Sequence, residues 1–353
     1  MKAIALTRKP TIGNVGNEIK ELEIPVPQIK DNEILVEIKT SAMQIDDISH
    51  AQGTTLGRFF GPKIVSENKP FIMGTEFSGI IAEIWKNVSK WKIGDEVINI
   101  TANTPEHGSW ANFRCVNQNK VRLKPQELSH REAVSMIIPG CVAYGMAMYS
   151  KVKKGDMCLI LWASWGIWGI LTQILKAKWV IVTGLCSTHN IEKVKANGAD
   201  FVIDYTKENF SEKLITQNIK MDLVFDSVWG KQLENQSIKI LNEKGKFITV
   251  CGPEKYIGSI KLSWNKIYSM LWYILKRSII SKIIGPKYIF YGTVSSSVID
   301  DMFDFVIKNE IKIPFDRVIP LRQKEMSEAL FHLASHKTTG RIIIDMIQEE
   351  VLI

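Results

Sequence analysis

The feature that most constrains the fold of this chain is a regular alternation of short apolar strands with helices between Met157 and Val250. A β-α-β unit joins two parallel strands through a right-handed crossover, and a series of such units builds a doubly wound sheet. Ligands of these sheets bind at the carboxyl ends of the strands, where the strand order reverses. The predicted strands are Met157–Leu161, Val180–Cys186, Phe201–Asp204, Asp222–Asp226 and Lys246–Val250, and the first two helices are Gly166 to about Lys178 and Ile191–Asn197. The sequence therefore predicts an α/β domain with a parallel sheet.

The residues before about Lys124 follow a different, two-residue periodicity that is typical of half-buried strands. Short strands with glycine and proline between them predict a barrel-like β domain. The end of the chain adds a helix and a closing strand, which we expect to return to this β domain. The segments are the strands Asn32–Ile38 and Phe77–Ile84, the turn and strand from Ile93–Val97, the helix Glu325–His336 and the strand Gly340–Asp345. We predict domains at residues 1–128, 129–294 and 295–353, the last being the return.

Composition excludes several other classes of protein. A chain of 353 residues suits two domains. Its formal charge of +8 comes from 45 basic and 37 acidic residues scattered along the chain, whereas a nucleic-acid-binding protein would need a basic stripe. The five cysteines are far apart and form no C-x-x-C pair, which predicts reduced thiols, a cytoplasmic location and no structural zinc lobe. The N-terminus lacks the apolar region of a signal peptide and is expected to form a strand.

One stretch, 267–285, is apolar but contains Lys276, Arg277 and Lys282. Charges at its centre exclude a membrane span. Two interpretations stay open: a basic amphipathic helix that makes peripheral contact with a membrane, or a helix that covers a substrate pocket or a partner subunit.

Seven short motifs occur in order along the chain. They are Gly74–Gly79, Ile93–Val97, Gly108–Ala111, Pro139–Tyr144, the strand-turn-helix from Met157, Asn197–Tyr205 and Ile313–Leu321. In this order the chain resembles the zinc-independent quinone oxidoreductase branch of the medium-chain dehydrogenase/reductase (MDR) superfamily. The resemblance implies a GroES-like β-barrel domain, a Rossmann domain that binds NADPH, a small carbonyl or quinone substrate, and a homodimer.

The same resemblance allows a test for catalytic zinc. Zinc-dependent relatives carry a cysteine, a histidine and a further cysteine or histidine at positions that align near Ala42, at Thr75 and near Ile138. None of these three residues supplies the nitrogen or sulfur ligands that zinc requires. We therefore expect no catalytic metal.

The resemblance also places a glycine-rich turn, G-A-S-G-G-V-G, after the first parallel strand. Glycine is required there for a tight turn, for contact between main chain and diphosphate, and for close helix packing. This chain instead has tryptophan at three of those positions, and at three further positions where the family has glycine. The predicted nucleotide-binding residues of this turn are Ser164, Trp165, Gly166, Ile167 and Trp168; the six tryptophans are Trp85, Trp162, Trp165, Trp168, Trp179 and Trp229.

Two explanations compete for these tryptophans. If they are real, indole rings block the phosphate cradle and the protein is a non-catalytic member of the family. Six such replacements would cost about as much as the total stability of a domain, about 5–15 kcal/mol. Alternatively, the gene uses UGA for glycine and has been translated with UGA as tryptophan. The codons at the six positions distinguish these explanations.

The end of the second parallel strand determines the choice between NADPH and NADH. An acidic residue there binds the ribose 2′-hydroxyl of NADH, but this chain has Ser187, Thr188 and Asn190, which can donate hydrogen bonds to a 2′-phosphate. The resemblance places Tyr205 against the same phosphate or the adenine. It also places Gly252, Gly292 and Val294 beside the nicotinamide half.

Without zinc, the substrate carbonyl must be polarised by hydrogen bonds. The resemblance gives Gln44 and Asp47 as catalytic candidates, in a loop where the family has N-P-x-D, and Tyr144, which either lines the nicotinamide pocket or is a core aromatic. The predicted function is NADPH-dependent reduction of a quinone or an α,β-unsaturated carbonyl. The alternatives are a non-catalytic homologue, a zinc-free alcohol dehydrogenase and an enoyl-thioester reductase.

Overall fold

The computed structural model describes residues 1–54, 59, 61–99, 108–164, 166–227, 230–251, 263–292, 298–313 and 315–346. The described residues form two compact units, which are treated separately below. Unit 1 contains those up to Ile138 and those from Ile313 onward, and unit 2 contains those from Pro139 to Lys312.

These units place the junctions later in the chain than the predicted boundaries at 128/129 and 294/295. The first junction falls inside one continuous helix, α4 (His130–Tyr149). The second follows α10 (Val298–Lys308), which belongs to unit 2 rather than to the terminal return. The physical reason is that Phe305 of α10 packs against Tyr144, with ring centroids 5.4 Å apart.

The described residues of unit 1 form two sheets, the three α-helices α1, α2 and α11, a short 3₁₀ helix at Gln118–Lys120 and the beginning of α4. A three-stranded sheet has the order β2-β1-β4, and a larger sheet has the order β15-β16-β3-β5-β6-β8, with β7 paired to β3. All pairs are antiparallel except β15 with β16. The strands are β1 (Lys2–Leu6), β2 (Ile19–Glu23), β3 (Glu33–Met43), β4 (Phe71–Ile72), β5 (Glu76–Ile84), β6 (Glu96–Asn99), β7 (Phe113–Asn117), β8 (Val121–Leu123), β15 (Phe315–Pro320) and β16 (Arg341–Asp345), and the helices are α1 (Val15–Glu18), α2 (Ile45–Gln52) and α11 (Gln323–Ala334).

The return of the chain end to the β domain is visible in the strand pairing. β16 pairs antiparallel with the carboxyl-terminal half of β3, with Ile343 opposite Ala42. Their apolar side chains join a core that contains Ile4, Met43 and Trp110. The predicted closing strand therefore completes the sheet that carries the loop with Gln44 and Asp47.

Unit 2 contains the doubly wound sheet, which confirms the predicted fold class. Its strand order is β11-β10-β9-β12-β13-β14, and all neighbours are parallel. The order reverses between β9 and β12, the point at which such sheets bind nucleotides. The strands are β9 (Met157–Ile160), β10 (Ile181–Cys186), β11 (Phe201–Asp204), β12 (Met221–Asp226), β13 (Leu241–Thr249) and β14 (Lys287–Phe290), and the helices are α5 (Gly166–Ala177), α6 (Ile191–Ala196), α7 (Phe210–Thr216), α8 (Lys231–Ile240), α9 (Trp264–Ile280) and α10.

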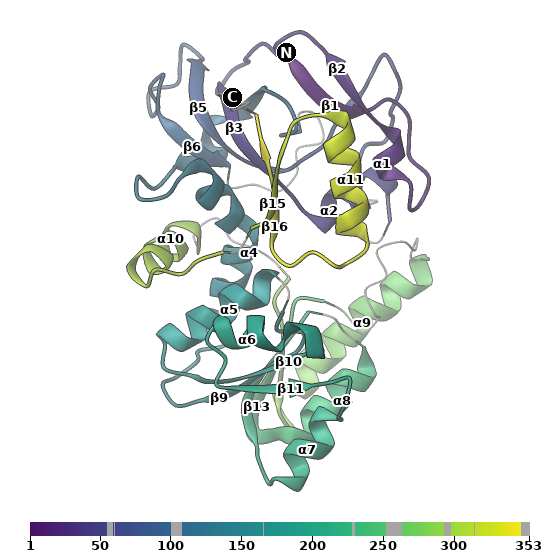
Figure 1. Cartoon of the computed structure of the whole chain (residues 1–353), viewed down its shortest axis with the longest axis vertical. Coiled ribbons are helices and arrows are strands. Elements are labelled where there is room, and N and C mark those ends of the chain that lie inside the picture. The colour runs from purple at the N-terminus through teal and green to yellow at the C-terminus, as the bar shows by residue number, and fades with distance from the viewer. Residues whose placement is uncertain are drawn as a thin grey trace. The chain divides into compact units, whose positions relative to one another are not determined.

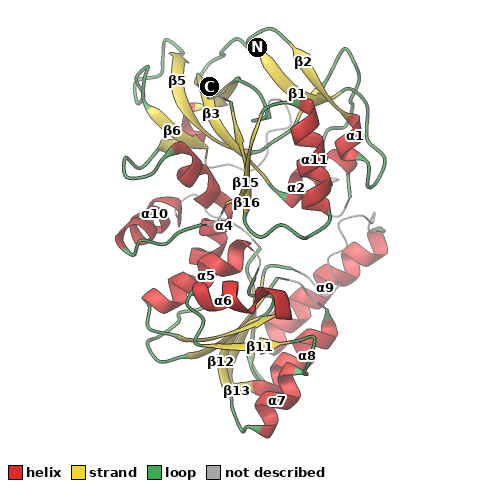
Figure 2. Cartoon of the chain, viewed as in Figure 1, coloured by secondary structure: helices red, strands yellow, loops and turns green. Residues whose placement is uncertain are grey.

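The helices of unit 2 cover both faces of its sheet. Figure 1 shows α5 and α6 on one face, and α7, α8 and α9 on the other. Figure 2 shows the same helices in red around the yellow strands. Leu159, Val224 and Phe247, on three neighbouring strands, are buried in the core beneath one of these layers. Because both faces are covered, the central strand β9 is a continuous apolar run, Met157–Ile160.

One helix of the described residues, α4, has the length and hydropathy to cross a membrane. Its most apolar window is 67% buried within the protein, and buried core helices pass the same test.

Candidate functional site

The turn after β9 lies between the carboxyl ends of the two strands that flank it. The Leu161 N–H donates to the carbonyl of Phe225 on β12, at 2.9 Å, and the Ala163 N–H donates to that of Leu185 on β10, also at 2.9 Å. The turn is therefore fixed at the point where the strand order reverses.

The predicted phosphate-binding residues extend from this turn into α5. Ser164 is buried at its end. Gly166 is the first residue of α5, and a Cβ added to it would meet no heavy atom within 4 Å. Ile167 follows it, and the first turn of α5 contains no acidic residue. Unpaired N–H groups at such a helix start attract a diphosphate, so the main chain of this turn fits the pyrophosphate of a dinucleotide.

The side chain of Trp162 does not fit that purpose. Its indole stacks on the ring of Tyr205, with centroids 5.2 Å apart and 29° between the planes. Tyr205 is the residue expected to contact the nucleotide, so the indole covers one of its faces. The backbone of Trp162 has a φ of +57°, in the left-handed region that bulky residues rarely adopt and glycine adopts freely.

Trp168 differs from Trp162 because its indole is accommodated. The side chain is fully buried, and its Nε1 donates to the hydroxyl of Ser227 at 2.6 Å. Trp85 is less well accommodated, since its Nε1 is buried without a hydrogen-bond partner. Four of the positions singled out in the sequence lie outside the described residues: Trp165, Trp229, Gly252 and Val294.

Trp179 also has a left-handed backbone, with a φ of +60°. It directly follows the last turn of α5, where its N–H donates to the carbonyl of Lys176 at 2.9 Å and the N–H of Val180 donates to that of Leu175 at 3.0 Å. These two bonds form a Schellman motif, whose left-handed residue is usually glycine. The backbone at Trp162 and Trp179 is therefore in the left-handed region that favours glycine, which agrees with the hypothesis that both codons encode glycine.

Replacing Trp179 with glycine is expected to stabilise the protein by about 1 kcal/mol, because the left-handed conformation costs a residue with a Cβ about that much. The indole is 71% exposed, so little packing is lost. The free energy of unfolding from urea titration measures the effect. Alanine is the matched control: it removes the same indole but keeps a Cβ, and an equal gain from W179A would contradict the backbone argument.

The ribose end of the predicted nucleotide site contains a carboxylate that the segment 187–190 lacks. The hydroxyl of Thr188 donates to Oδ2 of Asp204 at 2.5 Å, and Asp204 is at the end of the neighbouring strand β11. Hydrogen bonds from Thr188 and Thr206 lower the pKa of Asp204, and Lys207 lies 3.9 Å from it. Asn190 donates to the Ser187 hydroxyl at 3.1 Å. Ser187 and Asn190 thus keep hydrogens for a phosphate, whereas the single hydroxyl hydrogen of Thr188 is already used.

Two other predicted residues of unit 2 have packing contacts. Tyr144 is half-buried against Phe305, and burial together with Asp301 and Asp304 raises its pKa. This contact favours the core-aromatic alternative that the sequence left open. Gly292 follows β14, where an added Cβ would lie 2.4 Å from the ring of Phe290, so the chain is close-packed there.

In unit 1, Gln44 and Asp47 are brought together at the start of α2. Gln44 is the residue before the helix, and its N–H donates to Oδ2 of Asp47 at 2.9 Å. The side-chain amide of Gln44 donates to the hydroxyl of Thr75, and all three residues are buried. Burial raises the pKa of Asp47 well above its ordinary range. A primary amide has two N–H bonds, so Gln44 can also donate to a substrate oxygen.

A buried ion pair supports this cluster. Glu76, the first residue of β5, pairs with Arg341, the first residue of β16. The other carboxylate oxygen of Glu76 accepts from the N–H of Ile138 at 2.8 Å. Oδ1 of Asp47 and Nε of Arg341 are both buried without a hydrogen-bond partner. Sequence reasoning missed this pair because its members are 265 positions apart.

The positions aligned with zinc ligands contain other chemistry. Ala42 is buried on β3, opposite Glu76, while Thr75 accepts from Gln44 and Ile138 contributes only its main-chain N–H. Within the described part of the chain, no three His, Cys, Asp or Glu side chains form a group that could hold a metal.

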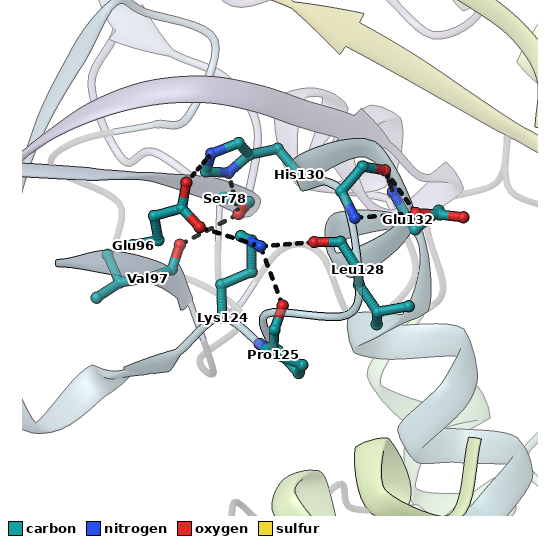
Figure 3. Close-up of polar contacts among 9 residues, drawn as sticks. Ser78, Glu96, Val97, Lys124, Pro125, Leu128, His130 and Glu132 are labelled. Carbon is teal, nitrogen blue, oxygen red and sulfur yellow. Dashed lines mark hydrogen bonds and ion pairs between the residues drawn. The ribbon is translucent and has the colours of Figure 1, made fainter. Parts of the chain in front are cut away.

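Figure 3 shows a serine, a histidine and a glutamate in a row, an arrangement that can also serve nucleophilic catalysis. The Ser78 hydroxyl lies 2.7 Å from Nδ1 of His130, and Nε2 of His130 lies 3.3 Å from Glu96. Ser78 is fully buried and 3.2 Å from the carbonyl of Val97. Lys124 completes the cluster through Glu96 at 3.1 Å. Because the Ser78 hydroxyl is fully buried, no substrate can reach it and it does not serve as a nucleophile. The cluster instead joins β5, β6 and the start of α4.

This cluster makes stability depend on pH through His130. Burial lowers the pKa of His130 from its ordinary 6.5, despite the opposing effect of Glu96. The unfolded chain therefore binds a proton first as the pH falls, and the free energy of unfolding decreases below about pH 6.5. H130Q should remove this part of the pH dependence, measured by urea unfolding. H189Q, at an exposed histidine, should leave the curve unchanged; equal curves for wild type and H130Q would refute the assignment.

Comparison with known proteins agrees with both units. The alcohol dehydrogenase GroES-like domain family matches residues 30–126, and the zinc-binding dehydrogenase family matches residues 197–344. The chain belongs to the medium-chain dehydrogenase/reductase superfamily. The GroES-like and Rossmann domains expected from the sequence are confirmed.

Three proteins illustrate the similarity. The 2-methylene-furan-3-one reductase of Solanum lycopersicum is 24% identical over 92% of this chain and 74% of its own length. The chloroplastic NADPH-dependent alkenal/one oxidoreductase of Arabidopsis thaliana is 23% identical over 93% and 76%. The structure of the quinone oxidoreductase from Coxiella burnetii superposes with a TM-score of 0.77 at 22% identity, covering 98% of this chain and 99% of that one. The chain thus belongs to a superfamily of oxidoreductases that typically use NAD(P)H.

Proposed function

We propose that this MDR protein is an NADPH-dependent, zinc-independent reductase that transfers hydride to a quinone or to an α,β-unsaturated carbonyl. The observation that carries the proposal is the buried pair of Gln44 and Thr75. An amide and a hydroxyl polarise a carbonyl by hydrogen bonding rather than as metal ligands. The names of the tomato and Arabidopsis relatives support the substrate class.

When bound, NADPH would supply a hydride; the carbonyl or quinone oxygen would take up the negative charge, and a proton from solvent would complete the reduction. The second N–H of the Gln44 amide donates to that oxygen. Asp47 is a positioning residue, because it accepts from the N–H of Gln44 and holds the start of α2 in place. Donors fixed before the reaction stabilise the developing charge without reorganisation.

NADPH is preferred over NADH in this proposal because of the end of β10. Ser187 and Asn190 donate to the 2′-phosphate, and Lys207 offsets part of the charge of Asp204. The dependence on NADPH in the name of the Arabidopsis relative supports the same choice.

A second candidate is a non-catalytic member of the family, and the stack of Trp162 on Tyr205 favours it. In that case the protein binds neither NADPH nor NADH, whatever the acceptor.

Turnover with a panel of acceptors tests the proposal, on the chain as given and with glycine at 162 and 165. We expect NADPH oxidation by a 2-alkenal or a para-quinone, slower reaction with NADH, and no loss of rate after incubation with a chelator. Q44L should lower kcat/KM about tenfold, the value of one hydrogen bond, with an unchanged Kd for NADPH. The matched control is Q52L, at the other end of α2. If the protein oxidised only simple alcohols with NADP⁺, or reduced only enoyl thioesters with NADPH, the proposed quinone or enone substrate class would be wrong.

A further inference from the structure

Helix α9 exposes a continuous apolar stripe. Tyr268 and Trp272 are 65% and 66% exposed, and Ile283, just beyond the end of the helix, is 79% exposed. The exposed residues recur at intervals of three and four, which places them on one face of a helix. The stripe consists of Trp264, Tyr268, Leu271, Trp272, Leu275 and Ile279, and Ile283 and Ile284 extend it past the helix.

A different face of α9 already holds the helix on unit 2. Ile267 is buried, and Ile274 packs against the core of the sheet. Glu234 of α8, itself 1% exposed, accepts from the Tyr273 hydroxyl at 2.8 Å and from Nε of Arg277 at 2.6 Å. The helix is therefore anchored through its other side. The exposed stripe is therefore apolar surface that unit 2 does not use for its own packing.

The charged residues of the segment that carries the stripe are all basic. The segment 263–287 contains five basic residues and no Asp or Glu. Of these, Arg277 is used within unit 2 by Glu234, while the four lysines are exposed. The lysines are Lys266, Lys276, Lys282 and Lys287. A surface that combines aromatic and aliphatic side chains with cations is complementary to an apolar layer with an anionic boundary.

We propose that α9 lies on the surface of an anionic lipid bilayer, with its apolar stripe among the acyl chains and its lysines at the headgroups. Tryptophan and tyrosine favour that boundary because their rings are both apolar and polar. A second copy of the chain is a poorer occupant, because two such stripes would bring the same cations together with no carboxylate in the segment to neutralise them. This inference is independent of the reductase activity.

Co-sedimentation of the full-length protein with lipid vesicles tests the proposal. We expect binding to vesicles of phosphatidylcholine mixed with phosphatidylserine, little binding to phosphatidylcholine alone, and release by high salt. Each basic residue near an anionic leaflet strengthens partitioning about fivefold, so K276E with K282E should weaken it by at least about 25-fold. W272Q with L275Q should abolish it. K244E with I215Q, at exposed positions elsewhere in unit 2, is the matched control and should bind as the wild type does.

A second readout does not depend on any variant. Quenching of tryptophan fluorescence by lipids with brominated acyl chains is expected with wild-type protein and anionic vesicles, because bromine reaches only indoles inside the bilayer. Equal binding to both kinds of vesicle, binding unaffected by the α9 changes, or no binding would overturn the proposal. So would a wild-type dimer that W272Q with L275Q converts to a monomer, because a second copy would then cover the stripe.

Discussion

Replacing Trp162 and Trp165 with glycine is expected to tighten NADPH binding by about 100-fold, or about 2.7 kcal/mol. The reason is that the main chain of the turn after β9 and the start of α5 fit a diphosphate, while the Trp162 indole covers the face of Tyr205. Trp168 is left in place because its indole is fully buried, and removing a buried indole costs about 3–5 kcal/mol. Isothermal titration with NADPH gives the Kd of each form.

The matched control for this experiment is W179G. Trp179 has the same left-handed backbone but lies before β10, at the amino end of the strand, whereas dinucleotides bind at the carboxyl end. W179G should therefore stabilise the protein and leave the Kd for NADPH unchanged. If glycine at 162 and 165 produced no gain in affinity, the turn would not be a diphosphate site and the non-catalytic candidate would stand.

Replacing Arg341 with methionine is expected to lower the free energy of unfolding at pH 7 by about 3–5 kcal/mol, since it leaves a buried carboxylate unpaired. Glu76 is 2% exposed, and burial raises the pKa of this carboxyl group even though Arg341 opposes the shift. Without Arg341 the pKa of Glu76 rises further. Urea unfolding of wild type, R341M, E76Q and the double variant measures the coupling between the two residues.

The cost of R341M should also depend on pH. With a folded pKa above the unfolded value of 4.5, Glu76 is protonated in both states below about pH 4.5 and the cost is small there. The cost grows as the pH rises through the folded pKa. R317M is the control, because Arg317 is 42% exposed beside Asp316 and such pairs contribute about 1 kcal/mol or less. A loss with R341M no larger than that of R317M would mean that the pair does not support the site.

Part of the candidate site could be predicted from the sequence because its residues are neighbours along the chain. Gln44 and Asp47 are three positions apart, and the start of α2 necessarily brings them together. The turn from Ser164 into α5 likewise follows from the apolar strand before it and the helix after it. Their roles stay predictions, but their place at the ends of these elements was accessible from local pattern alone.

The other contacts of the site depend on distant parts of the chain. The hydroxyl of Thr75 accepts a hydrogen bond from the side-chain amide of Gln44, which is 31 positions away. The hydroxyl of Thr188 donates to Asp204 at the end of a neighbouring strand. The Thr188 hydroxyl, which the sequence predicts as a donor to the 2′-phosphate of NADPH, thus already donates to the carboxylate of Asp204. Propensity cannot reveal such pairs, since they form only when the sheet sets the strand register.

The sequence by itself determined the two kinds of domain, the parallel sheet and the unusual tryptophans, because periodicity and residue type are local properties of the chain. Only the tertiary structure decided that Glu76 meets Arg341, that the backbone at Trp162 and Trp179 is left-handed, and that α9 keeps an apolar stripe exposed. These features depend on which segments pack together in three dimensions, and the pattern of a single segment contains no information about its partners.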